Sequence, residues 1–119
     1  MYFQDRSYGG KIFRPSPKVN FSSKDSFLSV LTPWGSKSMD AKVSENFKNS
    51  FLSSVNDMET TSPFDRLSCL SSLANNLRIS LKLANDFIYH KENKDSYDIG
   101  YEALSVVSDG NELAWAQVG

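Results

Sequence analysis

The sequence predicts an α+β domain in which an antiparallel β-sheet or sandwich layer packs on a pair of long antiparallel helices. Apolar residues alternate with polar ones near both ends of the chain, which indicates strands. In the middle they recur every three or four residues, which indicates helices. An Asp109-Gly110 pair marks a hairpin turn near the end. The predicted order is strand, strand, helix, helix, strand and strand, which is a layered arrangement.

The composition limits what this chain can be. Its 119 residues, 39% of them hydrophobic and 23% charged, are typical of a globular domain with a core of its own. We assign residues 1–119 to a single domain whose completeness stays open, and residues 1–17 to an extended N-terminal arm within it. The formal net charge of −1 opposes a general nucleic-acid binder, which normally carries a basic surplus.

Three features bear on the cellular location. The single cysteine, Cys69, excludes an internal disulfide and fits a reducing compartment. No apolar run approaches the length of a membrane span. The N-terminus has no signal-peptide core. We therefore expect a cytoplasmic protein with no membrane partner.

The N-terminal arm is rich in aromatic residues and ends with Pro15 and Pro17. Within it, Tyr8–Arg14 has the pattern of a short strand at a sheet edge, because proline removes a donor from the ladder. The arm either binds a partner or lies on the core, and we favour the second interpretation.

Two strands are predicted before the first helix. Val19 and Phe21 alternate with polar residues, and residues 27–31 form a second apolar segment after a short polar connection. Thr32-Pro33-Trp34-Gly35 comes next. We expect these four residues to end the second strand in an exposed turn, because proline and glycine together interrupt regular structure.

Residues 38–55 are predicted to form the first helix. Ser38 is the expected N-cap, and Asp40 suits the positive end of the helix dipole. Apolar side chains recur every four residues and form one stripe: Met39, Val43, Phe47, Phe51 and Val55.

Residues 62–92 are predicted to form a longer helix, which would extend for roughly 40 Å. Ser62 is the expected N-cap, Pro63 the first helical residue, and Asp65 completes a capping-box-like pattern. The width of its apolar face favours packing against a sheet over a coiled coil. The stripe consists of Leu67, Leu70, Ala74, Leu77, Leu81, Ala84 and Ile88, and Leu73, Leu83 and Phe87 widen it into a broad face.

The chain ends in a predicted hairpin. Residues 100–107 form one arm, Ser108-Asp109-Gly110-Asn111 a type I′ turn, and residues 112–119 the other arm. Because the last strand has almost no charge on either face, it needs cover on both sides and a neighbour along its edge. We expect a second copy or a complementary chain segment to cover Leu113, Trp115 and Val118, in a homo-oligomer or a complex of cleaved fragments.

Four short sequences stand in the same order as motifs of one enzyme family: Ser23-Lys24-Asp25, Val30–Gly35, Gly100–Ala103 and Ala116–Gly119. Together with the order of elements they resemble the metal-dependent serine/threonine protein phosphatases, often called type 2C. The corresponding family motifs are an Asn-Gln/Glu-Asp segment, a Val-x-Asp-Gly-x-Gly-Gly turn, a Gly-x-x-Ala strand and an Ala-x-Val-Gly-Asp-Ser-Arg strand. The resemblance implies a partial domain of the phosphatase 2C type.

The departures from these motifs bear on the chemistry. In the family, an aspartate in the turn bridges two divalent ions that activate water for attack on a phosphate. Thr32 and Pro33 stand where the aspartate and a glycine would be, and threonine cannot supply the bridging charge. Of the N-terminal ligand positions only Asp25 keeps a carboxylate, and one carboxylate does not hold a metal pair. The resemblance therefore implies a pseudophosphatase without a cofactor, with Asp25 as a vestigial metal ligand.

Other catalytic arrangements are not indicated. His90, the single histidine, is expected near the end of the longer helix, where an imidazole interacts with terminal carbonyls. Cys69 is expected on the same helix as a buried or half-buried residue rather than a nucleophile. A Gly-x-Ser-x-Gly elbow, zinc-ligand spacing and a dinucleotide fingerprint are all absent from the sequence.

Two functions remain. The first is a non-catalytic interaction and signalling module in which Thr32-Pro33-Trp34-Gly35 binds a partner protein, unless Trp34 simply fills the vacant site. The second is a metal-dependent phosphoprotein phosphatase whose metal site around Asp25 is completed by a missing C-terminal segment or by a partner chain.

Overall fold

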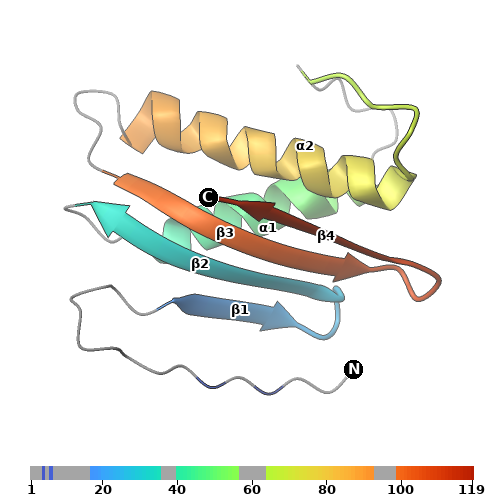
Figure 1. The fold of residues 1–119 in the computed structure, drawn as a ribbon, viewed down its shortest axis with the longest axis horizontal. Coiled ribbons are helices and arrows are strands. Elements are labelled where there is room, and N and C mark those ends of the chain that lie inside the picture. The colour runs from blue at the N-terminus through green and yellow to red at the C-terminus, as the bar shows by residue number, and fades with distance from the viewer. Residues whose placement is uncertain (1–3, 5, 7–16, 36–39, 57–63, 93–98) are drawn as a thin grey trace.

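The computed structural model describes residues 4, 6, 17–35, 40–56, 64–92 and 99–119. Four antiparallel strands form one sheet in the order β1-β2-β3-β4, and two helices pack against it (Figure 1). The predicted α+β class and the predicted order of elements are confirmed. The elements are β1 (Lys18–Ser22), β2 (Phe27–Gly35), α1 (Asp40–Asn56), α2 (Ser72–Phe87) with a π-helical turn (Ile88–Glu92), β3 (Ile99–Ser108) and β4 (Leu113–Val118).

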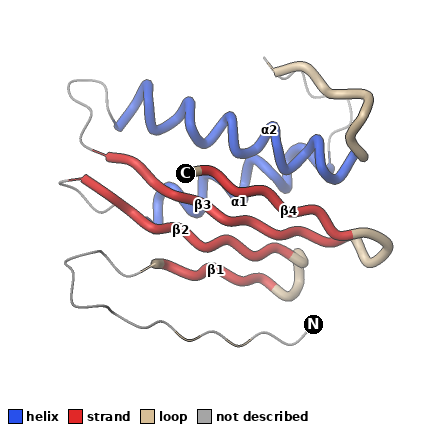
Figure 2. The backbone as a smooth tube through the Cα atoms, viewed as in Figure 1, coloured by secondary structure: helices blue, strands red, loops and turns tan. Residues whose placement is uncertain are grey.

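The sheet consists of two hairpins joined along their inner strands. β1 pairs with β2, β3 pairs with β4, and the register of β2 with β3 runs from Phe27 opposite Val107 to Gly35 opposite Ile99. Figure 2 shows the two inner strands side by side over most of their length. The first and last parts of the chain are therefore held together across the centre of the sheet.

The core lies between the helices and one face of the sheet. The Phe27 ring of β2 lies 5.2 Å from the Phe47 ring and 5.6 Å from the Phe51 ring, centroid to centroid, and all three side chains are buried. Tilted aromatic pairs of this kind add about 0.5–1.5 kcal/mol each beyond the burial of their surface. Val43 is also buried, so the predicted inward face of the first helix is confirmed at Val43, Phe47 and Phe51.

The α2 helix packs on β3 and β4 and completes this core. Leu73, Leu77 and Ala84 are buried and belong to one apolar cluster with Val107 of β3 and Ala114 of β4. The predicted apolar face is therefore confirmed in its central part. Because the cluster includes residues of β2, β3 and β4, both helices cover the same face of the sheet.

The predicted start of the longer helix is wrong. The α2 helix begins at Ser72, with Ser71 as its N-cap, because the Ala74 amide donates to Ser71 Oγ at 3.2 Å. The predicted N-cap Ser62 and first residue Pro63 lie outside the described residues, as do Ser38 and Met39 of the first helix and the N-terminal strand Tyr8–Arg14.

Residues 64–71 form an irregular segment held against α2 rather than its first turns. Arg78 donates from Nη1 to the Asp65 carbonyl at 3.0 Å, and Lys82 Nζ lies 5.0 Å from the centre of the Phe64 ring. Leu67, Leu70 and Cys69 are exposed on this segment, so Cys69 is neither helical nor buried as predicted. The helical spacing of the two leucines was misleading because contacts with α2 replace helical hydrogen bonds here.

Asn75 fixes this segment through its buried side chain. Its Oδ1 accepts from the Leu67 amide at 2.9 Å, and its Nδ2 donates to the carbonyls of Leu67, at 2.9 Å, and Leu70, at 3.2 Å. The residue is only 4% exposed. A buried amide that is satisfied in this way specifies one backbone path.

The second hairpin is present, but its turn is not type I′. Ser108 pairs with Leu113, which leaves a loop of residues 109–112, and only Gly110 in this loop has positive φ, at 92°. A type I′ turn requires positive φ at two successive residues. The loop is held instead by Asp109, whose Oδ1 accepts from the amides of Asn111 and Glu112 at 2.9 and 2.8 Å.

We predict that Asn75→Ala lowers the free energy of unfolding by about 2–3 kcal/mol, because it removes three part-buried hydrogen bonds of a buried side chain. Asn76→Ala is the matched control, since among the described residues the Asn76 side chain makes an exposed hydrogen bond, which it accepts from Arg66. The control should cost under about 1 kcal/mol in urea unfolding. Equal losses in the two variants would contradict the role of Asn75.

A second prediction concerns two serines paired across β2 and β3. Ser29 and Ser105 are directly opposite each other and fully buried, and neither hydroxyl has a hydrogen-bond partner among the described residues. Replacing either with alanine should leave the free energy of unfolding unchanged or raise it by about 1 kcal/mol, because an unpaired buried hydroxyl is costly. Ser80 is equally buried but donates to the Asn76 carbonyl, so Ser80→Ala should be the more costly change. A clear loss of stability in the Ser29 and Ser105 variants would show that their hydroxyls are satisfied.

Candidate functional site

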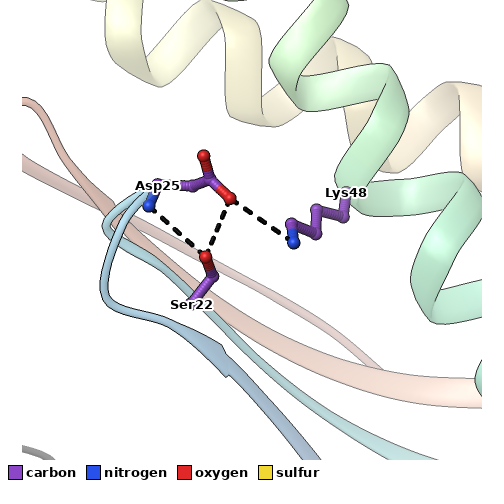
Figure 3. Close-up of polar contacts among 3 residues, drawn as sticks. All are labelled: Ser22, Asp25 and Lys48. Carbon is purple, nitrogen blue, oxygen red and sulfur yellow. Dashed lines mark hydrogen bonds and ion pairs between the residues drawn. The ribbon is translucent and has the colours of Figure 1, made fainter.

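The predicted vestigial metal ligand, Asp25, lies in the loop between β1 and β2. Ser22 Oγ donates to Asp25 Oδ2 at 2.8 Å, and the Asp25 amide donates back to Ser22 Oγ at 3.3 Å. Lys48 of α1 reaches the same carboxylate oxygen, with Nζ 3.4 Å from Oδ2 (Figure 3). The three side chains therefore connect the end of the first hairpin to the first helix.

The electrostatics of this group favour the ionised carboxylate. The hydrogen bond from Ser22 is the largest cause that lowers the pKa of Asp25 below its usual 3.8, and partial desolvation opposes it. The hydrogen bond and charge of Lys48 lower the pKa further. The Lys48 side chain is 30% exposed and that of Asp25 is 22% exposed, so solvent weakens the ion pair.

This arrangement is chemically closer to a structural ion pair than to a metal site. The Lys48 ammonium stands next to the oxygen that a divalent cation would need. Within the described ranges, no group of three or more His, Cys, Asp or Glu residues is placed to hold a metal ion. A catalytic Mg²⁺ or Mn²⁺ needs several oxygen ligands in near-octahedral geometry, and Asp25 contributes one carboxylate.

A shallow cavity lies next to this ion pair, between β1, β2 and α1. Its volume is about 120 Å³, and its polar lining comes from Asn20, Ser22, Ser44, Glu45 and Lys48. Ligand pockets in proteins usually measure about 300–1,000 Å³. The cavity is therefore too small for a cofactor or a phosphorylated side chain, and we assign it no ligand.

The predicted binding turn, Thr32-Pro33-Trp34-Gly35, is not a turn. These residues continue β2 and pair with Glu102, Tyr101, Gly100 and Ile99 of β3. Pro33 is buried. The pairing of β2 with β1 ends at Leu31. Among the described residues, Pro33 therefore has a neighbouring strand on the β3 side alone. A proline is tolerated there, because the side without a neighbour needs no backbone donor. The side chain of Trp34 is outside the description.

Asp25 and Thr32 do not share a site. Asp25 lies at the hairpin loop before Phe27, and Thr32 is five residues further along the same strand, which corresponds to roughly 16 Å. The strand therefore separates the two positions that the phosphatase resemblance would place around one metal pair. His90 is exposed on the π-helical turn, where its ring stands edge-on to Tyr89 with centroids 4.9 Å apart.

The three predicted interface residues of the terminal strand do not lie on one face. Leu113 and Trp115 are 60% and 66% exposed on the face away from the helices. Val118 pairs with Ala103, on the helix side, and is 50% exposed at the end of β4. The reason is the two-residue period of a strand, which places residues 113 and 115 on the face opposite residue 118.

The sequence interpretation missed the surface to which Leu113 and Trp115 belong. The registers place further apolar residues of all four strands on the same side of the sheet. Figure 1 shows this side toward the viewer, with no described helix in front of it. We call it the outer face, and it comprises Val19, Phe21, Leu28, Val30, Leu104, Val106, Leu113 and Trp115.

A signal for the outer face was present in the sequence. Leu28 and Val30 alternate with Phe27 and Leu31 in β2, so both faces of this strand are apolar. Strands that are buried on both faces have mainly apolar sequences of this kind, and in residues 27–31 Ser29 is the one polar residue. What the sequence could not show is which residues of the other strands lie in the same row.

Comparisons with protein-family models, with curated proteins and with solved structures find no match for this chain. The resemblance to the type 2C phosphatases therefore stays a prediction. The structure itself shows an ion pair between Asp25 and Lys48 that connects the first hairpin to α1, and an apolar outer face on the sheet.

The lowered pKa of Asp25 makes its contribution to stability depend on pH. Because the pKa is lower in the folded chain than in the unfolded chain, the contribution is complete above the ordinary value of 3.8 and is lost as the pH falls through the folded pKa. In an NMR titration of the Asp25 carboxyl carbon, the midpoint should lie below 3.8. Ser22→Ala should raise the midpoint more than Lys48→Met does, because the Ser22 hydrogen bond is the larger cause. A wild-type midpoint at or above the ordinary value would contradict this ion pair.

Proposed function

We propose that this chain is a non-catalytic protein-interaction module that serves in cytoplasmic signalling through the outer face of its sheet. The observation that carries the proposal is the exposure of large apolar side chains on neighbouring strands. Leu104, Leu113 and Trp115 are 40%, 60% and 66% exposed, and they lie together on β3 and β4. A contiguous exposed apolar patch on a folded chain marks an interaction surface.

Trp115 is the natural anchor of this surface. Its side chain stands on a strand whose backbone is paired with β3, opposite Val106. Tryptophan is enriched among the residues that dominate binding energy, because a large rigid ring buries much surface at little cost in side-chain entropy. The face offers few charges, so affinity on this surface would come from apolar contact.

The Asp25 group supports the absence of catalysis in this proposal. The carboxylate that a metal would need is hydrogen-bonded by Ser22 and paired with Lys48. A metal-dependent phosphatase completed by another segment or chain is the alternative. It would have to displace the Lys48 ammonium and bring every other oxygen ligand to this loop. Whether the scaffold is phosphatase-like remains part of the proposal.

We predict no release of phosphate from a phosphopeptide or an aryl phosphate in the presence of Mn²⁺ or Mg²⁺. Lys48→Met is the informative variant, because it removes the competing ammonium and leaves the Ser22 hydrogen bond to the Asp25 carboxylate in place. It should also show no turnover and no Mn²⁺ binding by calorimetry, since one carboxylate is not a metal site. Turnover by the wild-type chain that disappears in Asp25→Ala would overturn the proposal.

A further inference from the structure

We infer that the occupant of the outer face is a second copy of this chain, which packs its own outer face against the first. The inference rests on the proposed function and adds the identity of the partner. It predicts a homodimer in which two sheets stack about 10 Å apart with their helices on the outside.

The side chains of the outer face form two rows across the strands. Trp115 stands opposite Val106, Val106 opposite Leu28, and Leu28 opposite Phe21. The second row runs from Gln117 through Leu104 and Val30 to Val19 in the same way. Seven of these eight side chains are apolar. The first row is apolar from β4 to β1, and the second is apolar from β3 to β1 with Gln117 at its β4 end.

These two rows are complementary to each other in size. A two-fold axis that runs across the strands between the rows places the first row of one copy over the second row of its partner. Trp115 then lies over Gln117, Leu28 over Val30 and Phe21 over Val19. In the fourth pair the order is reversed, because Val106 lies over the larger Leu104, so every facing pair joins a larger side chain with a smaller one. Side chains of facing sheets interdigitate when large and small residues alternate in this way. One face therefore supplies both halves of the contact.

The charges are compatible with a contact between identical faces. By register, Glu102 is the one charged residue of β3 on this side, and it lies beyond the two rows opposite Thr32. The same axis moves the Glu102 of the second copy to the opposite end of the interface, so the two carboxylates stay apart. Neither row contains a charge, and a partner selected by charge complementarity would find nothing to pair with there.

The size of the face is sufficient for a dimer. Its four strands contain between five and ten residues, which corresponds to a surface of roughly 19 Å by 25 Å at ordinary strand spacing. Each copy then contributes roughly 500 Å², and the pair reaches the limit of roughly 1,000 Å² above which specific interfaces are found. The helix face cannot serve in the same way, because α1 and α2 already cover it.

Sedimentation velocity of the full chain from about 0.1 to 100 µM tests the inference, since an interface of roughly 1,000 Å² lies at the weak end of specific interfaces and should dissociate on dilution. The wild type should sediment as a dimer that dissociates on dilution. Leu104→Glu should weaken dimerisation on the order of a hundredfold, because it places a carboxylate from each copy in a desolvated apolar contact. Circular dichroism should show that this exposed substitution leaves the fold intact.

Leu67→Glu is the matched control. Leu67 and Leu104 are 39% and 40% exposed, but Leu67 lies on the segment before α2 and not on the outer face. This variant should dimerise like the wild type. Equal behaviour of the two glutamate variants would overturn the assignment of the face.

A second measurement leaves all eight residues of the outer face unchanged. The chain has two tryptophans, so Trp34→Phe leaves Trp115 as the single emitter. Its emission should shift to the red on dilution as the dimer dissociates and the ring returns to water. A wild-type chain that sediments as a monomer throughout, together with red emission from the Trp34→Phe variant at every concentration, would overturn the inference of a second copy. That result would not contradict the proposal of a non-catalytic chain, because that proposal is tested by a different measurement, the release of phosphate.

Discussion

The pairing of β2 with β3 is the interaction on which the rest of this structure depends. It joins the N-terminal hairpin to the C-terminal hairpin across both helices, with nine residues in register from Phe27 to Gly35. This register carries Val107 into the same cluster as Phe27, where Phe47 and Phe51 of α1 meet them. Without this pairing the two hairpins would be isolated pairs of strands, which are marginal in water.

The same register determines which residues lie on each of the two faces of the sheet, and both helices cover the same one of these faces. One face is buried beneath α1 and α2, and the other displays apolar rows with Trp115 at one end. A one-residue slip would exchange these sets, which the burial of Phe27, Leu31 and Val107 opposes. The chemistry of the outer face is therefore a direct consequence of the packing of the inner one, and recognition in this molecule follows from its fold.

The chemical role of the Asp25 carboxylate depends on the side chains next to it, Ser22 and Lys48. In a sequence motif this aspartate resembles a metal ligand, and in the structure it accepts from Ser22 and pairs with Lys48 of α1. The ion pair ties the first hairpin to the helix that carries Phe47 and Phe51. Asn75 has a comparable place at the start of α2, where its buried side-chain amide accepts one hydrogen bond and donates two that hold the segment before the helix. Polar groups at both positions organise the backbone.

The sequence by itself determined the type and order of the elements and the buried stripe Val43, Phe47 and Phe51, because side-chain periodicity is a local property. It could not place the start of α2 at Ser72 or carry β2 through Pro33, since contacts with Asp65 and with β3 override local propensity there. Only the tertiary structure paired Asp25 with Lys48 and gathered Leu104 and Trp115 on one face. Those neighbours are distant in sequence, and strand register, which sets them together, is decided by the packing of the whole sheet.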